Sequence, residues 1–228
     1  MTRQILRSRQ QAQNERGWYV YCVINSPAEK ISFGKLGFEG EEVYTMDYRS
    51  LSPVISDVAF REYAVSEEDV EVHKRVLGHV MQEYSVLPVA YGMAFKNRRL
   101  LQLAMSAGYT AMKKAFTVID GKVELGIKVI LPKDAEGWDE ARRRDFRSDF
   151  ILSLKDCAAD SKELKLFSDR MILNSAFLVE RSGVERFSEQ VGELSSRYGE
   201  LMVQYSGPWP AYNFVDIHIL GRKRKGFR

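Results

Sequence analysis

Residues 18–24 read WYVYCVI, and this stretch decides the fold of the first half of the chain. It is rich in β-branched and aromatic residues, which strands favour, and the turn-forming residues Asn25, Ser26 and Pro27 end it. No charged residue interrupts it. We therefore expect a buried central strand at this position.

The chain that follows predicts further strands around this central one. A glycine-rich connection is expected first, then a strand over residues 42–47, a turn or short helix start over residues 50–53, and a third strand in the region of residues 55–63. Residues 86–95, which read VLPVAYGMAF, are expected to be extended, with Pro88 and Gly92 marking an edge or a bulge.

Two helices are predicted in the same half. Ser66 followed by Glu67, Glu68 and Asp69 is typical of a helix start, because a hydroxyl caps the free amides and acids complement the helix dipole. A second, amphipathic helix is predicted over residues 100–117. Its expected inner side carries six residues: Leu100, Leu101, Ala104, Ala107, Ala111 and Ala115.

The second half begins at the turn dipeptide Asp120-Gly121, where the composition changes. The predicted elements are a strand at 123–131, a charged helix at 136–159, a strand at 171–179, a helix at 183–198 and a strand at 201–205. The sequence GPWP at 207–210 is expected to stop that strand, before a last apolar segment at 212–220. This order approximates a ferredoxin-like pattern.

The predicted fold class is thus α+β, with two domains that each pack helices on a mixed or antiparallel sheet. The C-terminal domain is expected to be ferredoxin-like. The expected organisation is a flexible N-terminal tail at 1–16, an N-terminal domain at 17–120, a C-terminal domain at 121–220 and a basic C-terminal tail at 221–228.

The charge balance is weak but uneven. The chain of 228 residues has 34 Lys and Arg against 31 Asp and Glu, a net charge of +3 that does not by itself imply a polyanionic partner. Basic residues gather at the ends: Arg3, Arg7, Arg9 and Arg16 at one, and Arg222, Lys223, Arg224, Lys225 and Arg228 at the other. They are interpreted either as solvated tails or as anchors to nucleic acid or an acidic protein surface.

The sequence predicts neither a membrane span nor a secretion signal. Its longest nearly apolar stretch, residues 86–95, is far short of the roughly 20 residues that a bilayer requires. The N-terminal residues lack the apolar segment of a signal peptide. An intracellular, cytoplasmic protein is therefore expected.

No catalytic, cofactor or metal motif is found. Cys22 and Cys157 have no metal-ligand spacing, and His73 and His79 are six positions apart on one predicted helix, so that they face different ways. His218 lies in a late predicted strand. Without a nucleophile motif or a phosphate-binding loop, the sequence predicts no enzyme, no cofactor and no small-molecule substrate.

One alternative is a basic ferredoxin-like module that binds nucleic acid. A ferredoxin-like half, basic tails and 11 tyrosines are features of RNA-recognition modules. The expected string of a basic residue, glycine and alternating aromatics is absent, which argues against nucleic acid as a partner.

The least generic string is GPWPAYNF at residues 207–214. Two prolines fix the backbone on either side of Trp209, and Tyr212 and Phe214 are expected to project with the period of a strand. The segment is either a rigid cap over the core or a preorganised aromatic surface. The second interpretation makes Trp209, Tyr212 and Phe214 candidate protein-binding residues.

Together with its neighbours, GPWPAYNFVDI resembles the C-terminal signature of the GvpF/GvpL family of gas vesicle proteins. The segments WYVYCVI, HKRVLGHVMQEYSVLPVAYGMAF, GKVELGIKV and RMILNSAFLV also resemble blocks of this family, in the same order. The blocks span residues 18 to about 217.

The resemblance implies an accessory or minor structural protein that supports nucleation or growth of the gas vesicle, a hollow protein shell. It implies two α+β domains and contacts with the small, apolar shell protein GvpA and with other accessory Gvp proteins. It brings no catalytic residue and no cofactor, and it implies a location in the cytoplasm and at the gas vesicle.

Overall fold

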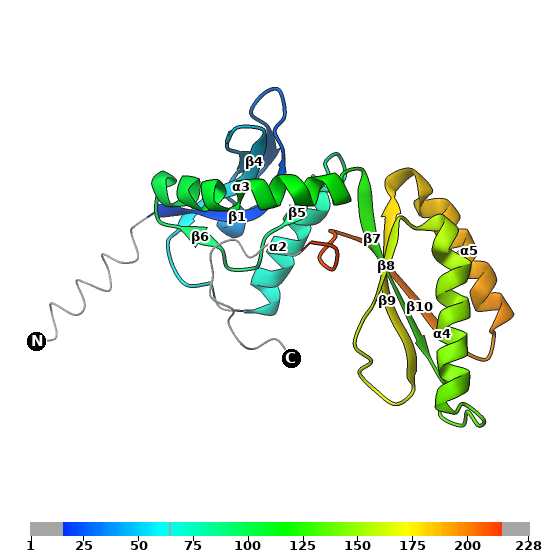
Figure 1. Ribbon diagram of the computed structural model, residues 1–228. Helices are drawn as coiled ribbons and strands as arrows, with labels where there is room; N and C mark the ends of the chain where they lie inside the picture. The colour runs from blue at the N-terminus through cyan, green and yellow to red at the C-terminus, as the bar shows by residue number, and fades with distance from the viewer. Residues whose placement is uncertain (1–15, 64, 216–228) are drawn as a thin grey trace, which may run out of the picture. The chain divides into compact units, whose positions relative to one another are not determined.

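The computed structural model describes residues 16–63 and 65–215. The described chain divides at Asp120 into two compact units, and the second unit is Gly121–Phe214. Figure 1 shows the elements of both units, which are described separately below.

The first unit is built on an antiparallel sheet with WYVYCVI inside it. The sheet comprises β1 (Arg16–Asn25), β2 (Ser32–Gly34), β3 (Val43–Thr45), β4 (Leu51–Ala59), β5 (Leu87–Pro88) and β6 (Ala94–Phe95). The strand order is β2-β3-β4-β1-β5, and β6 also pairs with β1. Residues 19–24 of β1 are all buried, which confirms the predicted central strand.

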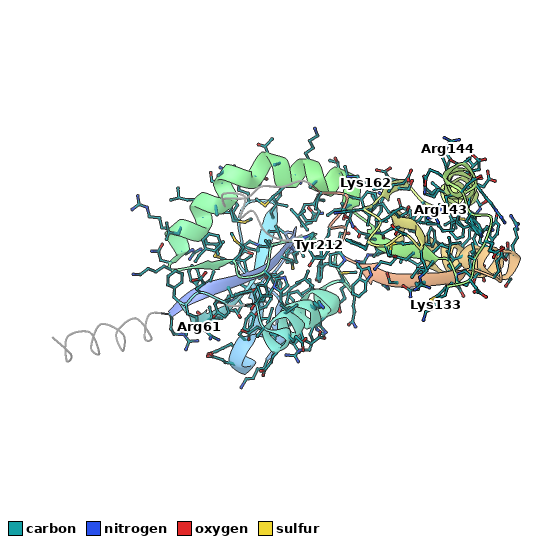
Figure 2. All side chains as sticks on the ribbon, turned by 90° about the horizontal axis from the view of Figure 1, so that it is seen from below. Arg61, Lys133, Arg143, Arg144, Lys162 and Tyr212 are labelled. Atoms are coloured by element: carbon teal, nitrogen blue, oxygen red, sulfur yellow. The ribbon has the colours of Figure 1, made fainter. Side chains whose placement is uncertain are left out.

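Helices α2 (Glu67–Val80) and α3 (Arg98–Ile119) lie on opposite sides of β1 (Figures 1 and 2). Successive side chains of a strand point to opposite faces. Tyr19 therefore meets His73 of α2, with its hydroxyl 3.0 Å from the His73 Nδ1, whereas Trp18 shares a pocket of the other face with Arg98 of α3.

The predicted start of α2 is confirmed. Ser66 precedes the first helical residue, and its Oγ accepts a hydrogen bond of 3.1 Å from the Asp69 amide. Replacing Ser66 by alanine should lower the free energy of unfolding of the first unit by about 1 kcal/mol, because one helix amide loses its acceptor. Thermal unfolding measures this loss. Ser106→Ala, at an exposed position inside α3, is the control and should not lower stability, since alanine favours helix more than serine by about 0.5 kcal/mol.

The second unit alternates strands and helices. Its elements are β7 (Lys122–Ile130), α4 (Glu140–Leu154), β8 (Asp160–Glu163), β9 (Met171–Glu180), α5 (Val184–Arg197) and β10 (Met202–Trp209). The four strands form an antiparallel sheet in the order β10-β7-β9-β8. The predicted α+β class is confirmed in both units, and the β-α-β-β-α-β order of the second is compatible with a ferredoxin-like fold.

In the second unit, one face of the sheet carries the core. Val123, Leu125, Ile127 and Val129 alternate along β7 and are buried. Phe177 of β9 packs on Phe187 of α5 with ring centroids 5.2 Å apart. Because side chains alternate, the intervening residues of β7 point to the other face, which is where the candidate surface lies.

Three expectations for the first unit are wrong. Residues 51–53, predicted as a turn or helix start, belong to β4, since Pro53 pairs with Val23 inside the sheet. The predicted glycine-rich connection contains β2 and a short 3-10 helix, Phe38–Gly40. Three residues placed on the inner side of α3, Leu100, Ala107 and Ala111, are exposed. Alanine and leucine favour helix on any face, so their presence does not fix which side is buried.

Three expectations for the second unit are also wrong. The predicted helix over residues 136–159 ends at Leu154, and β8 follows it. The GPWP sequence does not stop the last strand at residue 205, because β10 is an edge strand, where a proline is tolerated. Residues 212–214 form a turn rather than a strand, and residues 216–220 lie outside the described part.

Candidate protein-binding surface

The distinctive segment at residues 207–214 comprises the end of β10 and the turn after it. Gly207 has a φ of +115°, and a Cβ placed on it would lie 2.8 Å from the Glu124 carbonyl oxygen. Only glycine fits such a backbone at this distance. The peptide bond between Gly207 and Pro208 is cis. The close approach at Gly207 shows that the segment lies against β7, and Trp209 pairs with Glu124 across the two strands.

The three candidate residues are not equivalent. Trp209 is 47% exposed and Tyr212 is 49% exposed, but Phe214 is only 9% exposed. Two backbone bonds close the turn, from the Tyr212 amide to the Pro210 carbonyl and from the Phe214 amide to the Ala211 carbonyl. Since the chain turns here, Tyr212 and Phe214 do not alternate as in a strand. Two of the three aromatic side chains are thus available at the surface.

Glu124 of β7 ties the turn to the sheet. Its side chain is buried, on the face opposite the helix-covered core. One carboxylate oxygen accepts a hydrogen bond of 2.8 Å from the Asn213 amide, and the other accepts one of 2.6 Å from the Asn213 Nδ2. Burial raises the pKa of Glu124, and the two bonds from Asn213 oppose that shift.

Lys162 of β8, labelled in Figure 2, contacts the same turn. Its Nζ donates a hydrogen bond of 2.7 Å to the Asn213 carbonyl oxygen and lies 5.4 Å from the centre of the Phe214 ring. Together, Glu124 and Lys162 satisfy the amide, the carbonyl and the side chain of Asn213. The turn is consequently a fixed part of the sheet, and we call these three residues the latch.

Sequence reasoning missed the latch. Glu124 is the only polar residue of VELGIKV before Gly126, and the strand predicted at residues 123–131 was read as a simple alternation of apolar and polar residues. A carboxylate alone in an apolar strand was the available signal, because a buried charge requires partners. Nothing local in the sequence identifies Asn213 or Lys162 as those partners.

The two edge strands of the second unit differ in character. Every residue of β8 is polar and exposed: Asp160, Ser161, Lys162 and Glu163. β10, at the other end of the strand order, contains no charged residue and exposes Met202, Tyr205 and Trp209. Charges on an edge discourage pairing with another chain, so β8 is protected along its whole length. In β10 only Pro208 and the register shift after Ser206 have this effect, and residues 202–206 carry no such protection.

The described cysteines and histidines are not among the residues of this surface. Cys22 is buried, which raises the pKa of its thiol, and Cys157 is partly exposed. His73 is buried and His79 is exposed, which confirms that they face different ways. Within residues 16–63 and 65–215, no three His, Cys, Asp or Glu side chains gather as metal ligands, and no helix has the length and apolarity to cross a bilayer.

Several predicted features fall outside the described residues. They are His218, the basic residues of the C-terminal tail and, at the other end, Arg3, Arg7 and Arg9. Arg16, counted in the N-terminal tail, is the first residue of β1 and forms an ion pair of 2.8 Å with Glu41.

Comparisons with known proteins agree over nearly the whole chain. The family model "Gas vesicle synthesis protein GvpL/GvpF" matches residues 17–139 and 136–216. Gas vesicle protein F of Haloferax mediterranei is 40% identical over 214 residues, covering 91% of this chain and 97% of that protein. Gas vesicle protein F1 of Halobacterium salinarum is 36% identical over 214 residues, covering 92% and 98%.

A solved structure has the same fold. The crystal structure of the gas vesicle protein GvpF from Anabaena aligns with a TM-score of 0.78 at 18% identity, covering 88% of this chain and 98% of that one. At this identity the likeness concerns the fold, which extends through both units.

Proposed function

The chain belongs to the GvpL/GvpF family of gas vesicle proteins, and on that premise we propose that it binds the shell protein GvpA and other accessory Gvp proteins to support vesicle nucleation or growth. Membership of the family supports a role in gas vesicle formation. The family is not known as an enzyme family, which fits an accessory or minor structural role at the vesicle.

The proposed role answers a physical problem. A small, apolar shell subunit that has not yet assembled exposes strands and helices through which it can aggregate. A partner that pairs with a strand edge, or offers an aromatic patch, covers such surfaces until the subunit joins the shell. The second unit carries both features side by side.

The observation that carries this proposal is the uncharged edge of β10, which ends at the half-exposed Trp209. Exposed tryptophan is a common anchor of protein interfaces. Tyr212 lies just beyond it on the latched turn, so that little conformational freedom is lost on binding. Phe214 supports the surface from beneath, since it is buried.

The proposal is tested by capturing purified GvpA with the full-length chain at low and at high salt. We expect capture that persists at high salt, because an apolar contact is not screened. Capture lost at high salt would instead assign the contact to charged residues such as the basic tails. Retention of nucleic acid with no capture of GvpA would overturn the proposal in favour of the nucleic-acid alternative.

Trp209→Ala locates the contact. We expect capture of GvpA to weaken about tenfold or more, since truncating an anchor tryptophan costs at least 1–2 kcal/mol of binding free energy. The matched control is Phe167→Ala, which removes a 71% exposed aromatic side chain from the same unit. Both variants should unfold cooperatively. A Trp209 variant that unfolds would show that the residue is a structural cap.

A further inference from the structure

Helix α3 of the first unit has two apolar faces. Eight of its residues are buried against the unit: Leu101, Ala104, Met105, Gly108, Met112, Ala115, Phe116 and Ile119. A second set is exposed: Leu100, Leu103, Ala107, Ala111 and Val118. At 100° per residue, this second set lies within about 80° around the helix axis, as one stripe.

The stripe is long and well exposed. Leu100, Leu103 and Val118 have exposed fractions of 45%, 55% and 41%. Between them, Ala107 and Ala111 are small enough to let another backbone approach. Residues three, four and seven positions apart lie on one face of a helix, so these five side chains can contact the same partner helix, with Lys114 between Ala111 and Val118. Figure 2 shows α3, in green, along the edge of the first unit.

The charged residues of α3 are all positive. Arg98, Arg99, Lys113 and Lys114 are exposed, and α3 contains no Asp or Glu. At 100° per residue, Lys114 lies within the stripe, Arg99 and Lys113 lie beyond one edge of it, and Arg98 lies on the opposite side of the helix. Among the described residues, none of these four side chains forms an ion pair. A helix that packs on this stripe therefore gains most if it is acidic.

The charge pattern disfavours a second copy and the two ends of this chain as the occupant. A second copy packed α3 to α3 would set arginines and lysines against one another in either direction. Residues 1–15 hold three arginines and one acid, and residues 216–228 hold five basic residues and one acid. Neither end of the chain complements a basic stripe.

We propose that the outer stripe of α3 is a docking surface for an acidic amphipathic helix of a partner protein. Leucines of that helix would pack between Leu100, Leu103 and Val118, and its flanking glutamates or aspartates would pair with Arg99, Lys113 and Lys114. The surface is separate from the edge of β10. The inference therefore stands whether or not the proposed function of β10 holds.

The test uses a fluorescent peptide of about 20 residues, three heptads with Leu at the seam positions and Glu beside them, and a sister peptide with Lys in place of Glu. Fluorescence anisotropy measures the binding of each to the full-length chain. We expect saturable binding of the Glu peptide, and binding of the Lys peptide at least tenfold weaker. Raising the salt concentration should weaken binding of the Glu peptide, because salt screens its contacts with the basic residues.

Two matched variants locate the site. Leu103→Asp should weaken binding of the Glu peptide about tenfold or more, since it places an acid in the stripe. Leu152→Asp alters a leucine on α4 that is 63% exposed, against 55% for Leu103, and should leave binding unchanged. Both variants should keep the circular dichroism spectrum of the parent chain.

Equal binding of the two peptides, or no effect of Leu103→Asp, would overturn the proposal. So would a dimer of the chain that Leu103→Asp dissociates, because the occupant would then be a second copy.

Discussion

Replacing Glu124 by alanine is expected to lower the free energy of unfolding of the second unit by about 2 kcal/mol. The change removes the acceptor of both Asn213 bonds, which leaves the backbone amide and the Nδ2 of Asn213 without their partner. Part of this loss is regained, because the buried carboxylate no longer has to be kept out of water. Urea unfolding followed by tryptophan fluorescence measures the difference.

The control for this variant is Glu163→Ala in β8 of the same sheet. Glu163 is exposed, so its removal should change stability by less than about 0.5 kcal/mol. Equal effects of the two substitutions would contradict the latch, because Glu124 would then be an ordinary surface acid. Glu124→Ala should also weaken GvpA capture if the latch holds Tyr212 and Trp209 in place.

The sequence predicts elements best where one local signal decides them. WYVYCVI predicts a buried strand because only an apolar, β-branched and aromatic run fits between two neighbouring strands. Ser66 predicts a helix start because its hydroxyl caps the helix within three residues. Both predictions depend on contacts near in sequence or on composition alone.

Prediction from the sequence fails where an element is determined by a strand that is distant along the chain. Pro53 reads as a turn residue, yet it lies in β4, opposite Val23, thirty residues earlier in the chain. Pro208 reads as the end of a strand, but it is tolerated because β10 has a neighbour on one side only. The order of strands in the sheet determines whether these residues form a turn or a strand, and local residue preferences carry no information about that order.

Of the candidate surface, too, one part could be predicted from the sequence and another could not. Trp209 stands out in the sequence because two prolines flank it, and the structure leaves it half exposed. The latch depends on Glu124 and Asn213, which are 89 positions apart, and no pattern in the sequence connects them. The second apolar stripe of α3 was missed for another reason, since three of its five residues, Leu100, Ala107 and Ala111, were predicted on the buried side of the helix.

The first unit is expected to lose stability in acid through a single histidine. His73 is buried among the rings of Tyr19, Tyr21 and Tyr91, and burial lowers its pKa from 6.5 to about 4, with a backbone bond at Val89 opposing the shift. Between these two pH values the unfolded chain binds a proton at His73 and the folded chain does not. Stability contributed by neutral His73 is therefore present above pH 6.5 and falls as the pH drops towards 4.

The expected size of this loss is about 3 kcal/mol across that window, since each pKa unit is worth about 1.4 kcal/mol. Denaturant unfolding at a series of pH values measures this loss as the slope of the free energy of unfolding against pH. His73→Phe should flatten that slope, because phenylalanine has no proton to bind. Other groups titrate in the same range, but they are common to parent and variant and cancel in the difference. His79→Gln, at the exposed histidine of the same helix, is the control for loss of an imidazole side chain. A His73 variant with an unchanged slope would show that the buried ring does not govern the acid sensitivity of the unit.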